Sequence, residues 1–169
     1  MTRVPIVDKD DNIIEYKERD ETLPTDLKRI AALWLTNTKG EILIAKRAFT
    51  KKHHPGQWGF ACTGAVEEGE SYEDTMRREI PEELGIHDLE ITMGPKFLPH
   101  EFEGFFYMCQ YFLATKDIPL EQFTLDLNEV AAVRWITPEQ LVAESQKHPE
   151  RFIADAENWK KWIEDKEPF

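Results

Sequence analysis

The chain has 169 residues, of which 41% are hydrophobic and 32% charged, so its length suits one domain with one hydrophobic core. It has no apolar run long enough to span a bilayer and no charged-then-apolar leader, and we therefore expect a soluble, cytoplasmic protein. The formal net charge of -12 repels phosphate backbones and anionic lipids, which argues against nucleic-acid and membrane partners. The only cysteines, Cys62 and Cys109, lack a metal-binding spacing, so we expect two buried free thiols and no disulfide framework or zinc site.

The first 27 residues are interpreted as an arm, and residues 28–169 as the main domain. Two apolar segments of the arm, residues 5–7 and 13–16, flank the sequence Asp8-Lys-Asp-Asp-Asn12. Apolar segments on either side of Asp and Asn residues are typical of two strands joined by a tight turn. The arm is therefore predicted to form a small hairpin.

Three short strands are predicted before residue 64. Residues 30–36 and 42–45 are apolar, and the turn-forming sequence Asn37-Thr-Lys-Gly40 separates them. This pattern predicts a hairpin. Residues 58–63 are the third predicted strand.

The second half of the chain alternates between strands and helices. The segment of residues 104–113 is so apolar that it is predicted to be a central strand, buried on both faces. Residues 130–136 are a further predicted strand. Thr137 then offers an N-cap, followed by a proline at the first helical position and a glutamine at the capping-box position, so a helix should extend to about Lys147.

The last segment carries apolar side chains at helical spacing, namely Phe152, Ile153, Ala156, Trp159 and Ile163. This stripe predicts a core-facing helix that begins near Pro149. Strands and helices in alternation indicate an α/β protein in which helices cover both faces of a sheet.

A glutamate-rich helix is predicted from Tyr72 to Leu84, because Ser71 is a suitable N-cap and Gly85 a natural stop. Residues three and four apart share a helix face, so Glu79, Glu82 and Glu83 should cluster at its C-terminal end. The helix macrodipole already places partial negative charge there, and a compensating cation is expected. Carboxylate oxygens suit magnesium, with manganese as the alternative. A merely solvated acidic face is the simpler interpretation, and the glutamates alone do not decide between the two.

The glutamates belong to a longer constellation. It consists of Gly64, five residues, Glu70, seven residues, Arg78-Glu79, Ile80, one residue, Glu82-Glu83, one residue, and Gly85-Ile86. Residues 64–86 thereby resemble a complete Nudix box, the signature of a superfamily of hydrolases that cleave diphosphate linkages. The order of the strands extends the resemblance more weakly over about residues 28–147.

The resemblance implies a Nudix-type α/β/α sandwich with a mixed central sheet, and it implies roles for particular residues. The metal site would consist of Glu79, Glu82, Glu83 and the backbone carbonyl of Gly64. Glu70 and Arg78 would pair and brace the loop of the box. The implied substrate is a small-molecule diphosphate, for example of the nucleoside-diphosphate type, and many relatives form homodimers.

Catalysis in such a site uses water as the nucleophile, activated and aligned by the metal. A carboxylate must accept the proton of that water. We choose Glu82, with Glu79 and Glu83 beside it, and the alternatives lie in later loops, at Glu101, Glu103 and Glu129. Pro81 lies inside the helix, where it removes a hydrogen-bond donor and crowds the preceding turn, so we predict a kink that shifts Glu82 and Glu83 relative to Glu79.

Residues 47–58 are the most basic stretch of this acidic chain, and they directly precede the strand that leads into the box. Arg47 and Lys51 are candidate substrate contacts, unless these cations simply balance nearby glutamates. We expect His53 and His54 to face solvent. The spacing Arg-Ala-x-x-Lys-Lys-x-x-Pro-Gly-x-Trp resembles the type 1 isopentenyl-diphosphate isomerases, which share the Nudix fold and contact diphosphate through such cations.

An isomerase of that kind is the first alternative function. It requires a catalytic cysteine followed by glycine, and a metal-binding histidine, where this chain has Thr63-Gly64-Ala65. Cys62 lies one position early, so on a strand it points to the opposite face. A non-catalytic nucleotide-binding module is the second alternative, but such modules usually lose box glutamates and none is lost here. Hydrolysis is therefore the preferred prediction.

Overall fold

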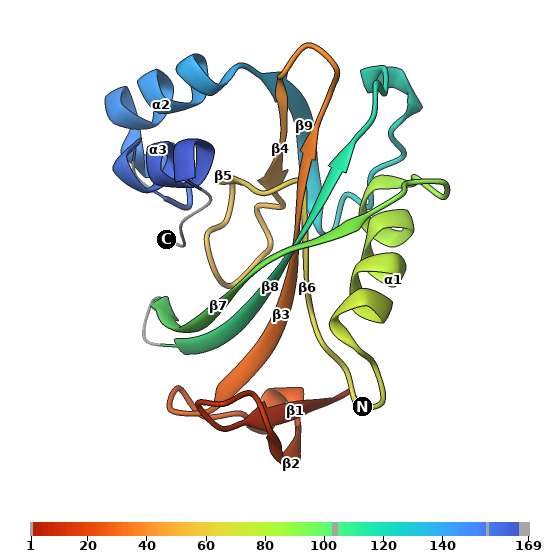
Figure 1. Cartoon of the computed structure of the whole chain (residues 1–169), viewed down its shortest axis with the longest axis vertical. Coiled ribbons are helices and arrows are strands. Elements are labelled where there is room, and N and C mark those ends of the chain that lie inside the picture. Colours follow the sequence, from red (N-terminus) through yellow and green to blue (C-terminus); the bar gives the residue numbers. More distant parts are fainter. Residues whose placement is uncertain (1, 103–104, 155, 166–169) are drawn as a thin grey trace.

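The computed structural model describes residues 2–102, 105–154 and 156–165, with the side chains of residues 98–102 and 105 excepted. Its strands are β1 (Arg3–Val7), β2 (Ile13–Glu18), β3 (Leu27–Thr36), β4 (Ile42–Arg47), β5 (Trp58–Gly59), β6 (Cys62–Ala65), β7 (Thr92–Phe102), β8 (Phe105–Thr115) and β9 (Val130–Ile136). Its helices are α1 (Tyr72–Leu84), α2 (Pro138–Lys147) and α3 (Ala156–Asp165). The strands form one mixed sheet, with α1 on one face and α2 and α3 on the other, which confirms the predicted α/β/α sandwich (Figure 1).

Strand β3 is the centre of the sheet. It pairs in parallel with β8 along its whole length, from Leu27 opposite Phe106 to Thr36 opposite Thr115. A strand has two hydrogen-bonding edges, so its other partners share the second edge in succession. These partners are β1, β6 and β4, all antiparallel to β3.

Successive side chains of β3 reach opposite faces of the sheet, because the side-chain period of a strand is two residues. Leu33 and Leu35 belong to the core cluster that includes Ile80 of α1. Trp34 belongs to the other cluster, where its ring lies 6.2 Å from that of Trp159 in α3. The apolar run of β3 therefore binds a helix layer to each face.

The prediction of a central strand at residues 104–113 is confirmed for the part that the structure describes. Strand β8 lies between β3 and β7. All residues from Met108 to Phe112 are buried, so both of its faces are covered. The predicted start, Gly104, lies outside the described residues.

The predicted hairpin of residues 30–36 and 42–45 is only partly correct. The turn is present, with Gly40 at φ 78° and its N–H donating to the carbonyl of Asn37 at 3.0 Å. However, β3 and β4 pair only through Thr36 and Ile42. The two strands diverge because β6 occupies the adjacent edge of β3, and β4 pairs instead with β5 and β9.

The single strand predicted over residues 58–63 is wrong. The structure divides it into β5 and β6, because the chain changes partner after Gly59. Strand β5 pairs with β4, whereas β6 pairs with β3. Local sequence favoured an extended chain throughout, and the exchange of partners is a tertiary effect.

The C-terminal elements are confirmed in part. Strand β9 and helix α2 have the predicted bounds, and the capping box of Thr137 and Gln140 is present. The final helix begins at Ala156, not near Pro149, because a short 3-10 turn follows α2 and Phe152 then forms a β-bridge with Trp58. The predicted stripe also omitted Trp162, whose side chain is fully buried.

Two further expectations concern features of the whole chain. Cys62 and Cys109 are buried free thiols, as predicted. No helix in the described residues is long and apolar enough to cross a membrane.

The arm lies against the rest of the molecule through two polar anchors. Strands β1 and β2 pair as antiparallel neighbours, and β1 touches β3 through Ile6 and Lys28. Arg3 holds the carboxylate of Glu68 with contacts of 2.8 and 2.9 Å, and its carbonyl accepts the Glu68 N–H at 2.8 Å. The arm therefore contacts the loop between β6 and α1, and its division from the domain of residues 28–169 stays a prediction.

The second anchor is Asp11, in the turn between β1 and β2. Its carboxylate accepts hydrogen bonds from Arg29 Nε at 2.7 Å, from the Tyr72 hydroxyl at 3.1 Å, and from Lys96. The side chains of Asp11 and Arg29 are 12% and 15% exposed, so this pair is largely shielded from water. One carboxylate thus joins the arm to β3, α1 and β7.

Replacing Asp11 with alanine is expected to lower the free energy of unfolding by about 2 to 4 kcal/mol, because the substitution leaves Arg29 and Lys96 without their shared carboxylate. Asp11 has a positive φ of 65°, which asparagine also tolerates, so Asp11→Asn is the matched control that removes mainly the charge. Urea unfolding at pH 7 measures both variants. Equal stability of Asp11→Ala and the wild type would contradict the role of this anchor.

The same anchor predicts a pH dependence. Burial acts to raise the pKa of Asp11, but hydrogen bonds and charges from Lys96 and Arg29 outweigh it and hold the pKa below the ordinary value. A carboxyl with a lowered folded-state pKa contributes stability that is present above the unfolded-state pKa of about 4 and is lost as pH falls through the folded-state pKa. The stability difference between the wild type and Asp11→Asn should therefore shrink below pH 4.

Candidate active site

Strand β6, the loop after it and helix α1 build the candidate site. The predicted N-cap begins the helix and is part of a capping box: the Ser71 hydroxyl accepts from the Asp74 N–H at 3.1 Å, and the Asp74 carboxylate accepts from the Ser71 N–H at 2.9 Å. Gly85, at φ 70°, ends it. The helix bounds are those predicted, because both ends carry strong local signals.

Backbone groups cap the C-terminal end of α1. The N–H of Thr124 donates to the carbonyl of Leu84 at 3.0 Å, and the N–H of Asp126 donates to that of Glu83 at 3.2 Å. The last turn contains no basic residue. These contacts satisfy carbonyl groups, but they add no positive charge near the carboxylates at this end of the helix.

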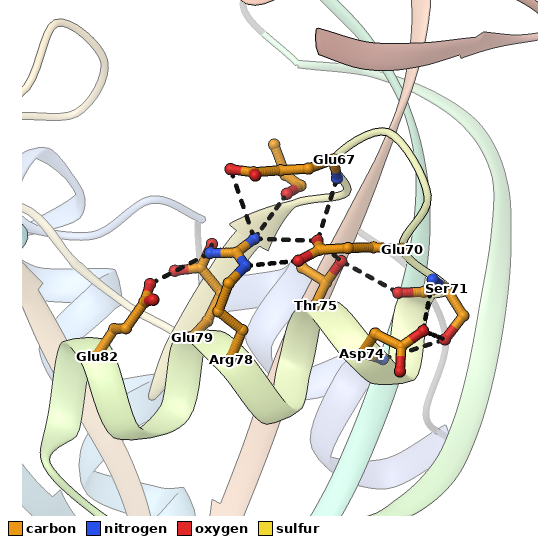
Figure 2. A network of polar contacts seen from close by, with 9 residues as sticks. Glu67, Glu70, Ser71, Asp74, Thr75, Arg78, Glu79 and Glu82 are labelled. Atoms are coloured by element: carbon orange, nitrogen blue, oxygen red, sulfur yellow. Dashed lines mark hydrogen bonds and ion pairs between the residues drawn. The ribbon is translucent and has the colours of Figure 1, made fainter. Parts of the chain in front are cut away.

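Arg78 lies at the centre of a carboxylate network (Figure 2). One edge of its guanidinium binds Glu70, through Nε at 2.7 Å and Nη2 at 3.1 Å. The remaining nitrogen, Nη1, contacts both Glu79 at 2.7 Å and Glu82 at 3.2 Å. Glu67 lies further away, 3.8 Å from Nη2. One positive charge thus faces four carboxylates.

Glu70 is held from its other side as well. Its Oε2 accepts from the Thr75 hydroxyl at 2.8 Å and from the Glu67 N–H at 3.2 Å. The pKa of Glu70 is lowered, because these hydrogen bonds and that of Arg78 outweigh the effect of burial, which acts to raise it. The loop of the box is therefore tied to α1 at a fixed point.

Gly64 allows Glu79 to lie against the backbone of β6. A Cβ atom at position 64 would lie 2.3 Å from Cγ and 2.4 Å from Cδ of Glu79, which no side chain other than hydrogen can satisfy without displacement. The pKa of Glu79 is raised chiefly by burial, while the charge and hydrogen bond of Arg78 act against the rise. The glycine thus sets the position of a carboxylate that is partly removed from water.

Glu83 is the most buried of the three glutamates, with 8% of the residue exposed. Burial raises its pKa to about 7, and the charges of Glu79 and Glu129 add to the rise, while hydrogen bonds from the Cys62 thiol and the Thr63 N–H oppose it. Its carboxylate therefore lies among other negative groups with little solvent to screen them.

The donor set and the charge balance suit a divalent cation. Oxygen donors and an excess of carboxylates over cations are what magnesium and manganese require. As the side chains stand, no three carboxylates, imidazoles or thiols among the described residues converge to hold a metal. Two of the carboxylates are instead engaged by Arg78, whose Nη1 contacts both Glu79 and Glu82.

Pro81 does not interrupt α1. The residues on both sides of it remain α-helical, and the Pro81 carbonyl accepts from the Gly85 N–H at 3.1 Å. The missing donor affects only the Arg77 carbonyl, which would otherwise receive the N–H of residue 81. The kink itself stays a prediction.

A cleft of about 940 Å³ lies beside the network. Its lining brings together the predicted residues Gly64, Glu79, Glu82, Glu83, Arg47 and Lys51. Arg47 Nε donates to the His53 carbonyl at 3.0 Å, and Lys51 is paired with Glu129. Of the two histidines, His53 is exposed, as predicted, whereas His54 is half-buried with its ring nitrogen 2.6 Å from Gln57.

The candidates for the proton acceptor differ in placement. Glu82 is 59% exposed beside Arg78, and Glu129 lines the cleft in its pair with Lys51. The side chain of Glu101 and the whole of Glu103 lie outside the described residues.

Some residues of the site were missed by the sequence analysis. Thr75, which is fully buried, and Cys62 support Glu70 and Glu83, and no local pattern distinguished them from ordinary core residues. Arg19 and Lys28 line the same cleft from the arm side. Their sequence neighbourhood is a polar linker, so only the tertiary structure could reveal them.

The fold and the site define an α/β/α enzyme with a glutamate-rich cleft, and comparison with known proteins identifies the family. Residues 26–157 match the family model described as the NUDIX domain. The chain therefore belongs to the Nudix family, whose hydrolases cleave phosphate anhydrides in small molecules and generally use divalent cations.

Individual relatives agree with this assignment. An uncharacterised Nudix hydrolase of Listeria monocytogenes is 37% identical over 125 residues, which cover 73% of this chain and 72% of that one. The crystal structure of DR0079 from Deinococcus radiodurans superposes with a TM-score of 0.79 and 25% identity, and covers 94% of this chain and 98% of that one. An isopentenyl-diphosphate Delta-isomerase of Halorhodospira halophila is 27% identical over 157 residues, covering 90% and 89%.

Replacing Gly64 with alanine is expected to reduce kcat/KM about a hundredfold or more, because the new methyl group displaces the Glu79 carboxylate. Gly40→Ala is the matched control, since Gly40 has no neighbouring atom within 4 Å of an added Cβ and lies in the turn before β4. It should lose roughly 1 kcal/mol of stability through its positive φ and keep its activity. Similar activity in the two variants would show that the close approach is unimportant.

Arg78→Lys should lower kcat/KM roughly ten- to a hundredfold with a small change in melting temperature. A lysine keeps the charge but cannot bind Glu70 through two nitrogens while contacting Glu79 with a third. Arg77→Lys is the control, because Arg77 is exposed and its ion pair in the described part of the chain is with Glu73. Full activity of Arg78→Lys would contradict the bracing role.

Proposed function

We propose that the chain hydrolyses a diphosphate linkage in a small molecule of the nucleoside-diphosphate type, with magnesium as the cofactor and manganese as the alternative. The observation that carries the proposal is the gathering of Glu79, Glu82 and Glu83 beside one 940 Å³ cleft. These carboxylates lie at the negative end of α1, whose last turn lacks a basic residue. This group of carboxylates repels an anionic substrate unless a cation is bound beside it.

The residues that would hold the metal are Glu79, Glu82, Glu83 and the backbone carbonyl of Gly64. When bound, the metal polarises the diphosphate oxygens and lowers the pKa of the attacking water. The Gly64 carbonyl is included because the first glycine of the Nudix box commonly supplies it, and Glu79 packs directly on this residue.

Arg78 serves the site in two ways under this proposal. Its Nε and Nη2 edge keeps Glu70 and the loop in place, while the Nη1 contacts are the ones that Glu79 and Glu82 would give up in order to hold the metal. The two functions use different atoms of one guanidinium, so the brace survives the exchange. Arg78 then acts as a counter-charge that limits repulsion among the glutamates before the cation binds.

Glu82 is our choice for the group that accepts the proton of the attacking water. It is the most exposed of the three box glutamates and its pairing with Arg78 is the longer one, at 3.2 Å. Glu129 is the alternative, since it lines the cleft, although its carboxylate is engaged by Lys51. Proton transfer requires contact with the water, and both residues lie in the cleft that would contain it.

Arg47 and Lys51 are proposed to contact the substrate phosphates. Both line the cleft, and Lys51 can exchange its carboxylate partner for a phosphate. The apolar lining of the cleft includes Phe60, Phe97 and Tyr111, which suits the non-phosphate half of a substrate.

The placement of Cys62 does not support the isomerase alternative, which requires a catalytic cysteine. Its side chain belongs to the core cluster of α1, and it donates its hydrogen bond to Glu83. Burial and the charge of Glu83 raise the pKa of this thiol well above its ordinary value. The Cys62 thiol therefore supports the Glu83 carboxylate under this proposal.

Three expectations from the sequence stay predictions. They are the absence of nucleic-acid and membrane partners, the cytoplasmic location and the formation of a homodimer.

The decisive experiment measures release of phosphate or nucleoside monophosphate from a panel of nucleoside diphosphates and triphosphates, nucleotide sugars, dinucleotides and prenyl diphosphates. Magnesium-dependent release by the wild type is expected, and it should fall about a hundredfold or more in Glu82→Gln/Glu83→Gln. The matched control is Glu73→Gln, on the exposed first turn of α1. Thermal stabilisation by a panel compound without any release would instead indicate a binding module, and conversion of isopentenyl diphosphate, followed by NMR, would indicate an isomerase.

A further inference from the structure

The arm contributes one wall of the cleft. Arg19 and Thr22, in the connection from β2 to β3, line the cleft together with Lys28 at the start of β3. The connection is held in place, because the Arg19 N–H donates to the Thr2 carbonyl at 2.9 Å and the Thr22 hydroxyl donates to the Arg19 carbonyl at 3.0 Å. Figure 1 shows the hairpin of β1 and β2 at the end of β3 remote from α2 and α3.

Most cations of the arm and its surroundings are matched by carboxylates. Arg3 binds Glu68, Lys17 binds Asp26, and Arg29 binds Asp11. The guanidinium of Arg19 has no hydrogen bond or ion pair within the described part of the chain, and the residue is exposed at the cleft. This arginine therefore differs from the structural cations around it.

Thr22 contacts both Arg19 and Lys28, which lie in the same part of the cleft wall. Lys28 is half-buried, and its pKa is lowered chiefly by burial; Asp26 acts against this effect and the charge of Arg19 adds to it. Lys28 Nζ also donates to Thr22 at 3.4 Å and lies 5.3 Å from the centre of the Tyr107 ring. Two neighbouring cations at a cleft wall are stabilised when an anion binds between them.

The pair lies at the same cleft as the catalytic residues, because Arg19, Lys28 and Glu79 all line it. An anion held by Arg19 and Lys28 therefore occupies the cleft that the carboxylates of α1 border. Asp20 also lines the cleft, so the wall is not uniformly positive.

We propose that Arg19 and Lys28 bind a terminal phosphate of the substrate, so that the arm is part of the substrate site. The proposal rests on the proposed hydrolase function and specifies its substrate class. Two cations match the two negative charges of a terminal phosphate better than the single charge of an internal one. The guanidinium supplies paired donors for phosphate oxygens. The enzyme is therefore selective for diphosphates with a free terminal phosphate over nucleotide sugars and dinucleotides.

The kinetic test compares ADP with ADP-glucose, at saturating magnesium, for the wild type and Arg19→Ala. KM for ADP should rise roughly ten- to a hundredfold, whereas kcat for ADP and the KM for ADP-glucose should change little. Arg19→Lys should recover part of the affinity. Arg77→Ala is the matched control, because Arg77 is also an exposed arginine, pairs with Glu73 and is not among the residues that line the cleft. A melting temperature for each variant confirms that it folds.

A binding measurement separates this proposal from the proposed function. Calorimetry with inorganic pyrophosphate needs no turnover. Arg19→Ala and Lys28→Met should each raise the dissociation constant for pyrophosphate roughly ten- to a hundredfold. If the wild type cleaves no compound of the panel and yet binds pyrophosphate in a way that depends on Arg19, the hydrolase function fails and the phosphate site stands. Hydrolysis of ADP with an unchanged KM in Arg19→Ala, or no pyrophosphate binding by the wild type, would overturn the phosphate site.

Discussion

The contact between Arg78 and its carboxylates is the interaction on which the candidate site depends. A single guanidinium joins Glu70 of the loop to Glu79 and Glu82 of the helix. Removing it would leave partly buried carboxylates facing each other, with repulsion that few solvent molecules screen. The loop, the helix and the cleft therefore take their positions from one cation, which four carboxylates share.

The sheet makes this arrangement possible by ordering its faces. Strand β3 has apolar side chains on both sides, and it holds β6 on one edge and β8 on the other. Because β6 leads directly into the loop and α1, the register of Gly64 opposite Ala31 fixes where Glu79 packs. The core thus determines the geometry of charged groups that are themselves unfavourable for folding, a common feature of functional sites.

Local signals allowed much of this to be predicted from the sequence. The bounds of α1 and α2 follow from capping residues and a terminal glycine or proline, which act within a few residues of the chain. The central position of β8 follows from its uninterrupted apolar character. Predictions failed where the outcome depended on partners distant in sequence: β3 and β4 diverge because β6 intervenes, and Phe152 joins Trp58 in a bridge although its spacing suits a helix. Arg19 and Lys28 could not be predicted as a binding pair for the same reason, because a linker separates them in sequence and only the fold brings them to one wall of the cleft.

The backbone bonds from Thr124 and Asp126 to the end of α1 constrain how this enzyme can diversify. They attach the connection before β9 to the helix, and an added Cβ at Gly85 would lie 2.8 Å from the Thr124 carbonyl oxygen. The end of α1 and this connection therefore cannot change in length or side-chain size independently of each other. Variation in substrate range is thereby directed to the arm and to the loop between β4 and β5. Insertions in the connection before β9 would disturb the glutamates of α1. Insertions in the arm or in the loop between β4 and β5 would change only which substrates the cleft accepts.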